Sequence, residues 1–177
     1  MTVDVTKDKV DAVIKAIRDL AKKRVLVGVP ASTDNRSDGS PIGNAEIGYI
    51  NEFGAPAANI PPRPHLVPGV RAALKPIIDQ LRQAAKVAID GDAGKVNAAL
   101  ERAGLVAESS VKNTIQKSIP PPLKPGSIRA RWGRQESRKG QPVPNNFAQS
   151  AIPLISTSGY LKSITYVVRK AKGNAQP

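Results

Sequence analysis

The sequence predicts an α+β fold: a small antiparallel or mixed β-sheet packed against an N-terminal helix and a long antiparallel helix pair, with an extended basic arm. Three long segments carry apolar residues at three- and four-residue spacing, which is typical of amphipathic helices. Two β-branched runs, at residues 24–29 and 164–169, predict strands that pair with each other. A segment rich in proline and glycine, residues 119–150, predicts the arm.

These elements predict one domain built from residues 1–118 and 151–170, with the arm at residues 119–150 and a flexible tail at residues 171–177. A chain of 177 residues is long enough to form one hydrophobic core. It contains only one Trp, three Tyr and two Phe, so we expect a small core made mainly of aliphatic side chains.

The helical pattern covers residues 4–23, 67–89 and 95–118. Pro76 lies inside the second of these segments, so it either kinks that helix or marks its true beginning. The glycine-containing break at residues 91–94 separates the last two segments by only a few residues. Two long helices joined so closely are expected to pack as an antiparallel pair.

The stretch between the first strand and the helix pair predicts a rigid spacer. Residues 45–53 follow a short helical pattern that ends at Gly54. The strap, which we define as Ile60–Pro68, then carries four prolines and reads IPPRPHLVP. Each proline favours extended geometry in the residue before it, so the strap should be stiff and not helical.

The arm is the most basic part of the chain. It contains a single acidic residue, Glu136. Its clustered basic residues are Arg129, Arg131, Arg134, Arg138 and Lys139. A stretch of about 30 residues without regular structure is unusual inside a compact domain. We therefore expect residues 119–150 to lack regular structure and to become ordered on a partner.

Charge is distributed unevenly along the chain. Of 27 Lys/Arg and 14 Asp/Glu residues, eight of each lie in residues 1–60, which leaves 19 basic and six acidic groups in residues 61–177. This imbalance favours contact with a polyanion or an acidic protein surface, although a merely soluble basic protein would also fit. No apolar run approaches the roughly 20 residues of a membrane span, so we expect no membrane contact.

Sequence patterns for catalysis and cofactors are lacking. The chain has no cysteine and a single histidine, His65, which excludes disulfides and thiolate metal sites. A Ser–His–Asp site around His65 is geometrically possible, but no pattern places a nucleophile beside it. Neither a phosphate-binding glycine loop nor a metal-ligand spacing occurs. We therefore predict that the protein is not an enzyme and binds no cofactor or metal.

Two kinds of partner fit the arm. Arg129, Arg131, Trp132 and Arg134 combine guanidinium groups with an indole, and this combination can contact phosphates and stack on bases. No known nucleic-acid-binding signature accompanies them, however. The interpretation that we favour is a basic arm laid on an acidic protein surface, with Trp132 as its apolar anchor. The alternative is a basic nucleic-acid-binding protein.

Four stretches resemble, in their order along the chain, the neck and tail-completion proteins of long-tailed double-stranded DNA bacteriophages, a group that includes minor tail and virion-morphogenesis proteins. They are AEIGYINEFG at residues 45–54, the strap, PPLKPGSI at residues 121–128 and PLISTSGYL at residues 153–161. Two positions depart from the family pattern. Asn51 replaces the common His before Glu-Phe-Gly, and His65 replaces the common Phe after Arg-Pro.

The resemblance implies a structural virion protein at the head–tail junction, assembled in the host bacterial cytoplasm and needed to join or finish the tail. Its expected partners are further copies of itself in a ring, expected to be a hexamer, together with neck, connector and tail tube proteins. Non-specific contact with DNA in the channel is also expected. We predict that ten residues form the subunit or partner interface: Glu52, Phe53, Arg63, Pro64, His65, Leu123, Arg129, Arg131, Trp132 and Arg134.

Phe53 and the strap are predicted to dock on the protein's own helix pair or on a neighbouring subunit. In this hypothesis, Arg63 pairs with a carboxylate such as that of Glu52. The alternative for Phe53 is a plain core residue. A ring requires heterologous contacts, in which one patch docks on a different patch of the next subunit, and a stiff strap suits such a contact.

Overall fold

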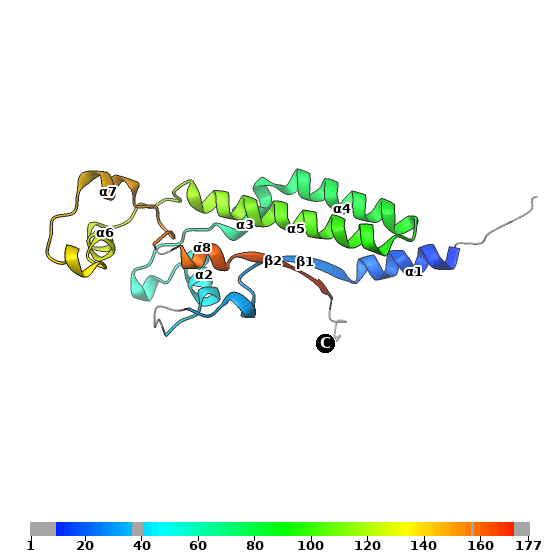
Figure 1. The fold of residues 1–177 in the computed structure, drawn as a ribbon, viewed down its shortest axis with the longest axis horizontal. Helices are drawn as coiled ribbons and strands as arrows, with labels where there is room; N and C mark the ends of the chain where they lie inside the picture. Colours follow the sequence, from blue (N-terminus) through cyan, green and yellow to red (C-terminus); the bar gives the residue numbers. More distant parts are fainter. Residues whose placement is uncertain (1–9, 37–40, 157, 172–177) are drawn as a thin grey trace, which may run out of the picture. The chain divides into compact units, whose positions relative to one another are not determined.

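The computed structural model describes residues 10–36, 41–156 and 158–171 (Figure 1). Residues 4–9 of the first predicted helix and residues 172–177 of the predicted tail therefore lie outside the described residues. No helix in the described ranges is long and apolar enough to cross a membrane.

The chain forms two compact units, and each is built from segments that are distant in the sequence. The first unit comprises Met1–Val27, Ala73–Ala107 and Tyr166–Pro177, and the second comprises Gly28–Ala72 and Glu108–Thr165. The expected organisation, in which residues 1–118 and 151–170 form a domain and residues 119–150 an arm, stays a prediction.

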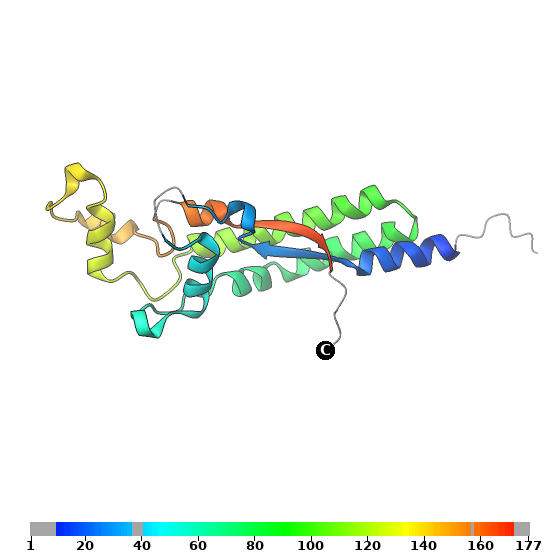
Figure 2. The same cartoon turned by 90° about the horizontal axis from the view of Figure 1, so that it is seen from below.

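The first unit contains α1 (Val10–Ala21), α4 (Leu74–Ile89) and the first part of α5 (Ala93–Gln116). Figures 1 and 2 show α4 and α5 side by side, which confirms the predicted helix pair. Their shared core is made of small aliphatic side chains: Ala84, Ala88, Val96, Ala99 and Leu100. The partly buried side chains that pack against this core are Ala16, Leu20, Val25, Val87 and Val168. Alanines at this contact let the two helix axes approach closely.

The sheet consists of two antiparallel strands, β1 (Lys23–Gly28) and β2 (Thr165–Lys170), as predicted. Each strand lies within one residue of its predicted position. A glycine of α5 sets the packing of the sheet on this helix, because a Cβ at Gly104 would overlap the ring of Tyr166 in β2. The α+β fold class is therefore confirmed.

The second unit contains α2 (Asn44–Phe53), α3 (Leu66–Ala72), the last part of α5, α6 (Pro125–Trp132), α7 (Asn145–Ser150) and α8 (Gly159–Ser163). Its largest fully buried side chains include Val111 and Ile115 of α5 and Ile164, which follows α8. α3 packs tightly on α5, since a Cβ at Gly69 would lie 2.6 Å from the Cα of Val111. The hydroxyl of Ser110 also donates to the carbonyl of Gly69, at 2.7 Å.

The predicted continuous helix over residues 67–89 is wrong. It is divided into α3 and α4 at Ala73, whose backbone angles (φ −106°, ψ 18°) are not helical. Pro76 is the third residue of α4, where its missing N–H removes no helical hydrogen bond. Of the two interpretations of Pro76, the beginning of a helix is the one observed.

The prediction that residues 119–150 lack regular structure is also wrong. The segment contains α6, α7 and a 3₁₀ turn at Glu136–Arg138. Pro125 is the first residue of α6, and Pro144 is the residue immediately before α7. Prolines that contributed to the prediction of an irregular arm therefore stand at or beside helix beginnings, where a fixed φ favours the first turn.

Candidate functional site

The second unit has an unusually polar centre, and Glu52 in the last turn of α2 lies within it. Glu52 is 6% exposed, and its carboxylate accepts hydrogen bonds from three backbone N–H groups. These belong to His65 at 2.7 Å, Leu66 at 2.9 Å and Val67 at 3.1 Å. The carboxylate thus caps the N-terminus of α3, where such N–H groups have no partner within the helix. It fixes the end of the strap to α2.

His65 is fully buried and its ring is satisfied on both sides. Nδ1 lies 2.9 Å from the carbonyl oxygen of Arg63 and 3.2 Å from Glu52, so both of its neighbours are acceptors. Nδ1 must therefore carry the proton, and Nε2 accepts from the hydroxyl of Tyr160 at 2.5 Å. Burial lowers the pKa of His65, against the smaller opposing effects of Arg63 and Glu52, so the ring is neutral.

Tyr160 of α8 is buried beside a glycine of α2. A Cβ at Gly48 would come within 2.8 Å of the Tyr160 hydroxyl, so only glycine leaves room for the ring at this point. The rings of Tyr160 and His65 also meet edge to face, with centroids 5.5 Å apart. Burial raises the pKa of Tyr160, with a smaller contribution from the charge of Glu52, and the phenol therefore stays protonated and donates.

The turn between α2 and the strap depends on Gly54, which adopts φ +80°. A Cβ here would lie 2.9 Å from the backbone nitrogen of Pro62, in addition to the strain of the positive φ. The strap then returns along α2, and the N–H of Arg63 donates to the carbonyl of Asn51 at 2.6 Å. Asn51 donates its own side-chain amide to the carbonyl of Ile47 at 2.8 Å.

Arg63 does not pair with Glu52, so this part of the hypothesis is wrong. The guanidinium is buried, 7% of the residue being exposed, and it donates to two carbonyls of the triple-proline run. Nε lies 2.9 Å from the oxygen of Pro121 and Nη2 lies 3.3 Å from that of Pro122. Burial lowers the pKa of Arg63. The strap is thereby attached to the segment that precedes α6.

Two further arginines hold the segment after α6. Nη1 of Arg131 donates to the carbonyls of Ile152 at 2.7 Å and Ile155 at 2.9 Å. Nη1 of Arg134 donates to the hydroxyl of Ser156. Carbonyl groups that have no partner in a helix or sheet thus accept hydrogen bonds from arginine side chains. Such bonds can fix the position of a proline-rich segment that does not belong to a sheet.

Arg63, Leu123, Arg131 and Arg134, all predicted interface residues, line one pocket of about 220 Å³ in the second unit. Sequence reasoning missed other residues that line it, namely Arg36, Asn51, Ser156, Ser158 and Tyr160. The SGY sequence at residues 158–160 is the signal that could have identified part of this set, since it belongs to a stretch that resembled the phage family.

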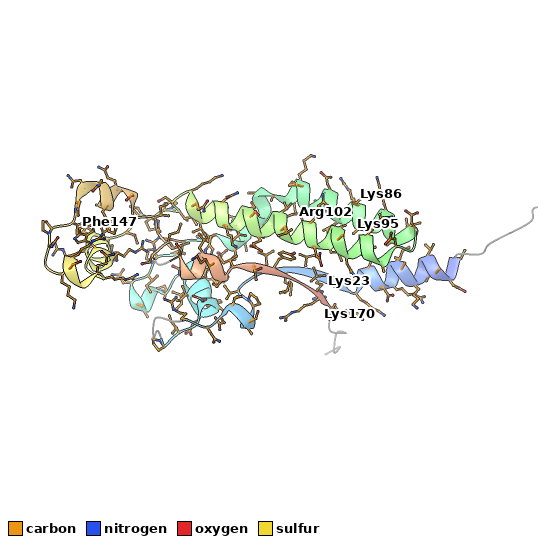
Figure 3. All side chains as sticks on the ribbon, viewed as in Figure 1. Lys23, Lys86, Lys95, Arg102, Phe147 and Lys170 are labelled. Atoms are coloured by element: carbon orange, nitrogen blue, oxygen red, sulfur yellow. The ribbon has the colours of Figure 1, made fainter. Side chains whose placement is uncertain are left out.

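Trp132 and Arg129 line a different pocket, of about 540 Å³, in the same unit. The indole packs edge to face on Phe147 of α7, labelled in Figure 3, with centroids 5.0 Å apart. The guanidinium of Arg138 lies 4.4 Å from the centre of the indole ring. Both contacts are made within the chain, so Trp132 acts here as the anchor of α6 and α7.

Phe53 and Pro64 are exposed. Phe53 keeps 63% of its surface exposed and packs only loosely on Tyr49, with ring centroids 4.9 Å apart, while Tyr49 itself is 66% exposed. The alternative that Phe53 is a core residue is therefore wrong. These two aromatic side chains form an apolar surface at the end of α2. The strap is extended only up to His65, because its last three residues belong to α3.

Comparison with protein-family models, curated proteins and solved structures gives no match to this chain.

Proposed function

We propose that this protein is a structural component of a tailed bacteriophage, which forms a homo-oligomeric ring at the head–tail junction and is needed to join or finish the tail. One observation carries the proposal. Four stretches resemble neck and tail-completion proteins, and two of them, residues 121–128 and 153–161, are distant in the sequence from residues 45–54 and the strap. Glu52, Arg63, Pro121 and Tyr160, one from each stretch, nevertheless belong to a continuous network of hydrogen bonds.

The chemistry of this network supports a structural role. Glu52 uses both carboxylate oxygens on backbone N–H groups, and His65 uses both ring nitrogens within the chain. Arg63 likewise donates to backbone carbonyls. These groups hold backbone segments in place, as a subunit requires when it must present one geometry to its neighbours in a ring.

The surface that the network holds is suited to a subunit contact. Phe53 and Tyr49 together expose two aromatic rings at the end of α2, and aromatic residues are enriched at protein interfaces. Phe53 directly follows Glu52, so the cap on α3 also fixes the position of the Phe53 backbone. We propose that this aromatic pair docks on a different surface of the next subunit.

The test is complementation of a phage that lacks this protein. Phe53→Asp should leave filled heads and separate tails, or tails of abnormal length, in electron micrographs of the lysate. Leu74→Asp is the matched control, because Leu74 is similarly exposed (50%) but lies outside the four stretches. Infectious particles at the wild-type yield from Phe53→Asp would overturn the proposed contact. Absence of the protein from purified virions and from assembly intermediates would overturn the function itself.

The second candidate, a basic nucleic-acid-binding protein, is favoured by the charge of the arginine-rich segment. It predicts tight binding of DNA by the purified protein, with an affinity that falls steeply as salt increases. The packing of Trp132 weakens this candidate, because Phe147 and Arg138 already cover the indole that would stack on a base. Binding of a DNA duplex measured across a salt series separates the two candidates.

A further inference from the structure

The pocket lined by Arg63, Arg131 and Arg134 concentrates positive charge. Arg36 lines it as well, with its Nη1 donating to the side-chain oxygen of Asn44 at 3.1 Å. No carboxylate is among the described residues that line this pocket. The carboxylate of Glu52 accepts hydrogen bonds from three backbone N–H groups and lies 3.2 Å from Nδ1 of His65. Its negative charge is therefore used within the strap and α3.

The partners that hold these arginines are neutral. Arg63 and Arg131 donate to backbone carbonyls, and Arg134 donates to a hydroxyl. Within the described chain, these bonds use Nε and Nη2 of Arg63 and only Nη1 of Arg131 and Arg134. A guanidinium has five N–H donors, so donors of all three side chains remain available to an acceptor in the pocket.

The arginines also disfavour one another. The pKa of Arg131 is lowered first by burial and then by the positive charges of Arg134 and Arg63. Like charges held close together raise the free energy of the folded chain, and the effect is largest where they are buried, as Arg63 is. An anion that entered the pocket would remove this penalty, and the preformed positions of Arg63 and Arg131 would reduce the entropy lost on binding.

We propose that this pocket receives the carboxylate of a glutamate or aspartate side chain from a neighbouring protein in the assembly, and that Arg131 and Arg134 bind it. The inference rests on the proposed function, because it names the chemistry of the partner at the same site. A planar guanidinium matches a carboxylate through two parallel hydrogen bonds, which gives the contact a fixed direction.

The rest of the lining favours an acidic side chain over a nucleic-acid phosphate. Ile47, Leu123 and Leu154 line the same pocket, and they can cover the methylene groups of an entering side chain. A volume of about 220 Å³ suits a single side chain.

The test uses the full-length protein labelled with ¹⁵N in its arginine side chains. The probe is a short peptide in which glutamates alternate with glycines, and the control peptide carries glutamine in place of glutamate. Nε–H resonances of Arg63 and Arg131 should shift with the glutamate peptide and remain unchanged with the glutamine peptide. Arg134→Gln should weaken binding by about 10- to 100-fold, the loss expected for one charge-assisted hydrogen bond.

Arg71→Gln is the matched control, because Arg71 is an exposed arginine of α3 that does not line the pocket. It removes the same charge from the same unit and should change the affinity less than about twofold. Arg131→Lys is the second variant. It keeps the charge but lacks the planar fork, so it should also weaken binding, and circular dichroism should confirm that each variant is folded.

Equal losses in Arg134→Gln and Arg71→Gln would overturn the proposal, because binding would then follow overall surface charge. Displacement of the peptide by a DNA duplex, with the same sensitivity to Arg134→Gln, would assign the pocket to phosphate and also overturn it. Failure here is distinguishable from failure of the proposed function. If the peptide does not bind but Phe53→Asp still blocks assembly, the pocket proposal fails and the proposed function stands. If the peptide binds but Phe53→Asp phage assemble normally, the proposed subunit contact fails and the pocket proposal stands.

Discussion

Glu52→Gln tests whether a buried carboxylate holds the strap. The substitution preserves the size and shape of the side chain and one oxygen acceptor, but it removes the charge. In the structure, Oε2 accepts the N–H groups of His65 and Leu66, and Oε1 accepts that of Val67. An amide can place its oxygen at the first position, and its NH₂ group then faces the N–H of Val67, donor against donor.

The expected loss follows from these three bonds. Two of them change from charge-assisted to neutral, which costs about 1 kcal/mol each. The N–H of Val67 loses its acceptor, and an unsatisfied, partly buried N–H costs about 1–3 kcal/mol. We therefore expect Glu52→Gln to lower the free energy of unfolding by about 3–5 kcal/mol, a large fraction of the stability of an ordinary domain.

Urea unfolding followed by circular dichroism measures this loss, and amide hydrogen exchange at Leu66 and Val67 reports the cap directly. Glu46→Gln is the control, because Glu46 is an exposed residue in the first turn of the same helix and should cost less than about 1 kcal/mol. Equal stability of the two variants, with unchanged exchange at Leu66 and Val67, would refute the reasoning.

Three further predictions concern the same unit. Gly69→Ala should destabilise the protein by about 1–3 kcal/mol in urea unfolding, because the new methyl group would overlap Val111, whereas Gly126→Ala meets no atom and should be neutral or slightly stabilising. Burial lowers the pKa of His65, so the unfolded chain binds a proton more readily than the folded one. The contribution of His65 to the free energy of unfolding is therefore fully present above the ordinary pKa of about 6.5 and is lost as the pH decreases. The melting temperature of the wild-type protein should fall between about pH 6.5 and about pH 5, and that of His65→Gln should lack this decrease. Tyr160→Phe keeps the ring but removes the hydroxyl that donates to His65, and it should lower the free energy of unfolding by about 1–2 kcal/mol.

Periodic patterns predicted the secondary structure well where local sequence decides it. The strand pairing and the helix pair follow from apolar spacing, and both are observed. The patterns failed at the prolines of residues 119–150. Pro125 and Pro144 stand at or beside a helix beginning, as does Pro76, for which the sequence left a kink and a helix beginning open. The same residue type either breaks or begins a helix, depending on the tertiary contacts of the turn that follows it.

The candidate site was less predictable because its contacts join residues that are far apart in the sequence. Glu52 and Arg63 are 11 positions apart and oppositely charged, so pairing them was the simplest interpretation of the sequence. In the structure each satisfies backbone groups of another segment. Backbone N–H and carbonyl groups are present at every position, so the sequence carries no mark of which of them need a side-chain partner.

This network gives His65 a physical role. A phenylalanine at position 65 could fill the same space, but it could not accept the hydroxyl hydrogen of Tyr160 or donate to the carbonyl of Arg63. His65 thus makes two directed hydrogen bonds where a phenylalanine would make only apolar contacts, and the bond to Tyr160 links the strap to α8. Directed bonds fix relative orientation more narrowly than apolar packing does. The histidine is therefore best understood as an orienting residue, because it holds the backbone of Arg63 on one side and the hydroxyl of Tyr160 on the other.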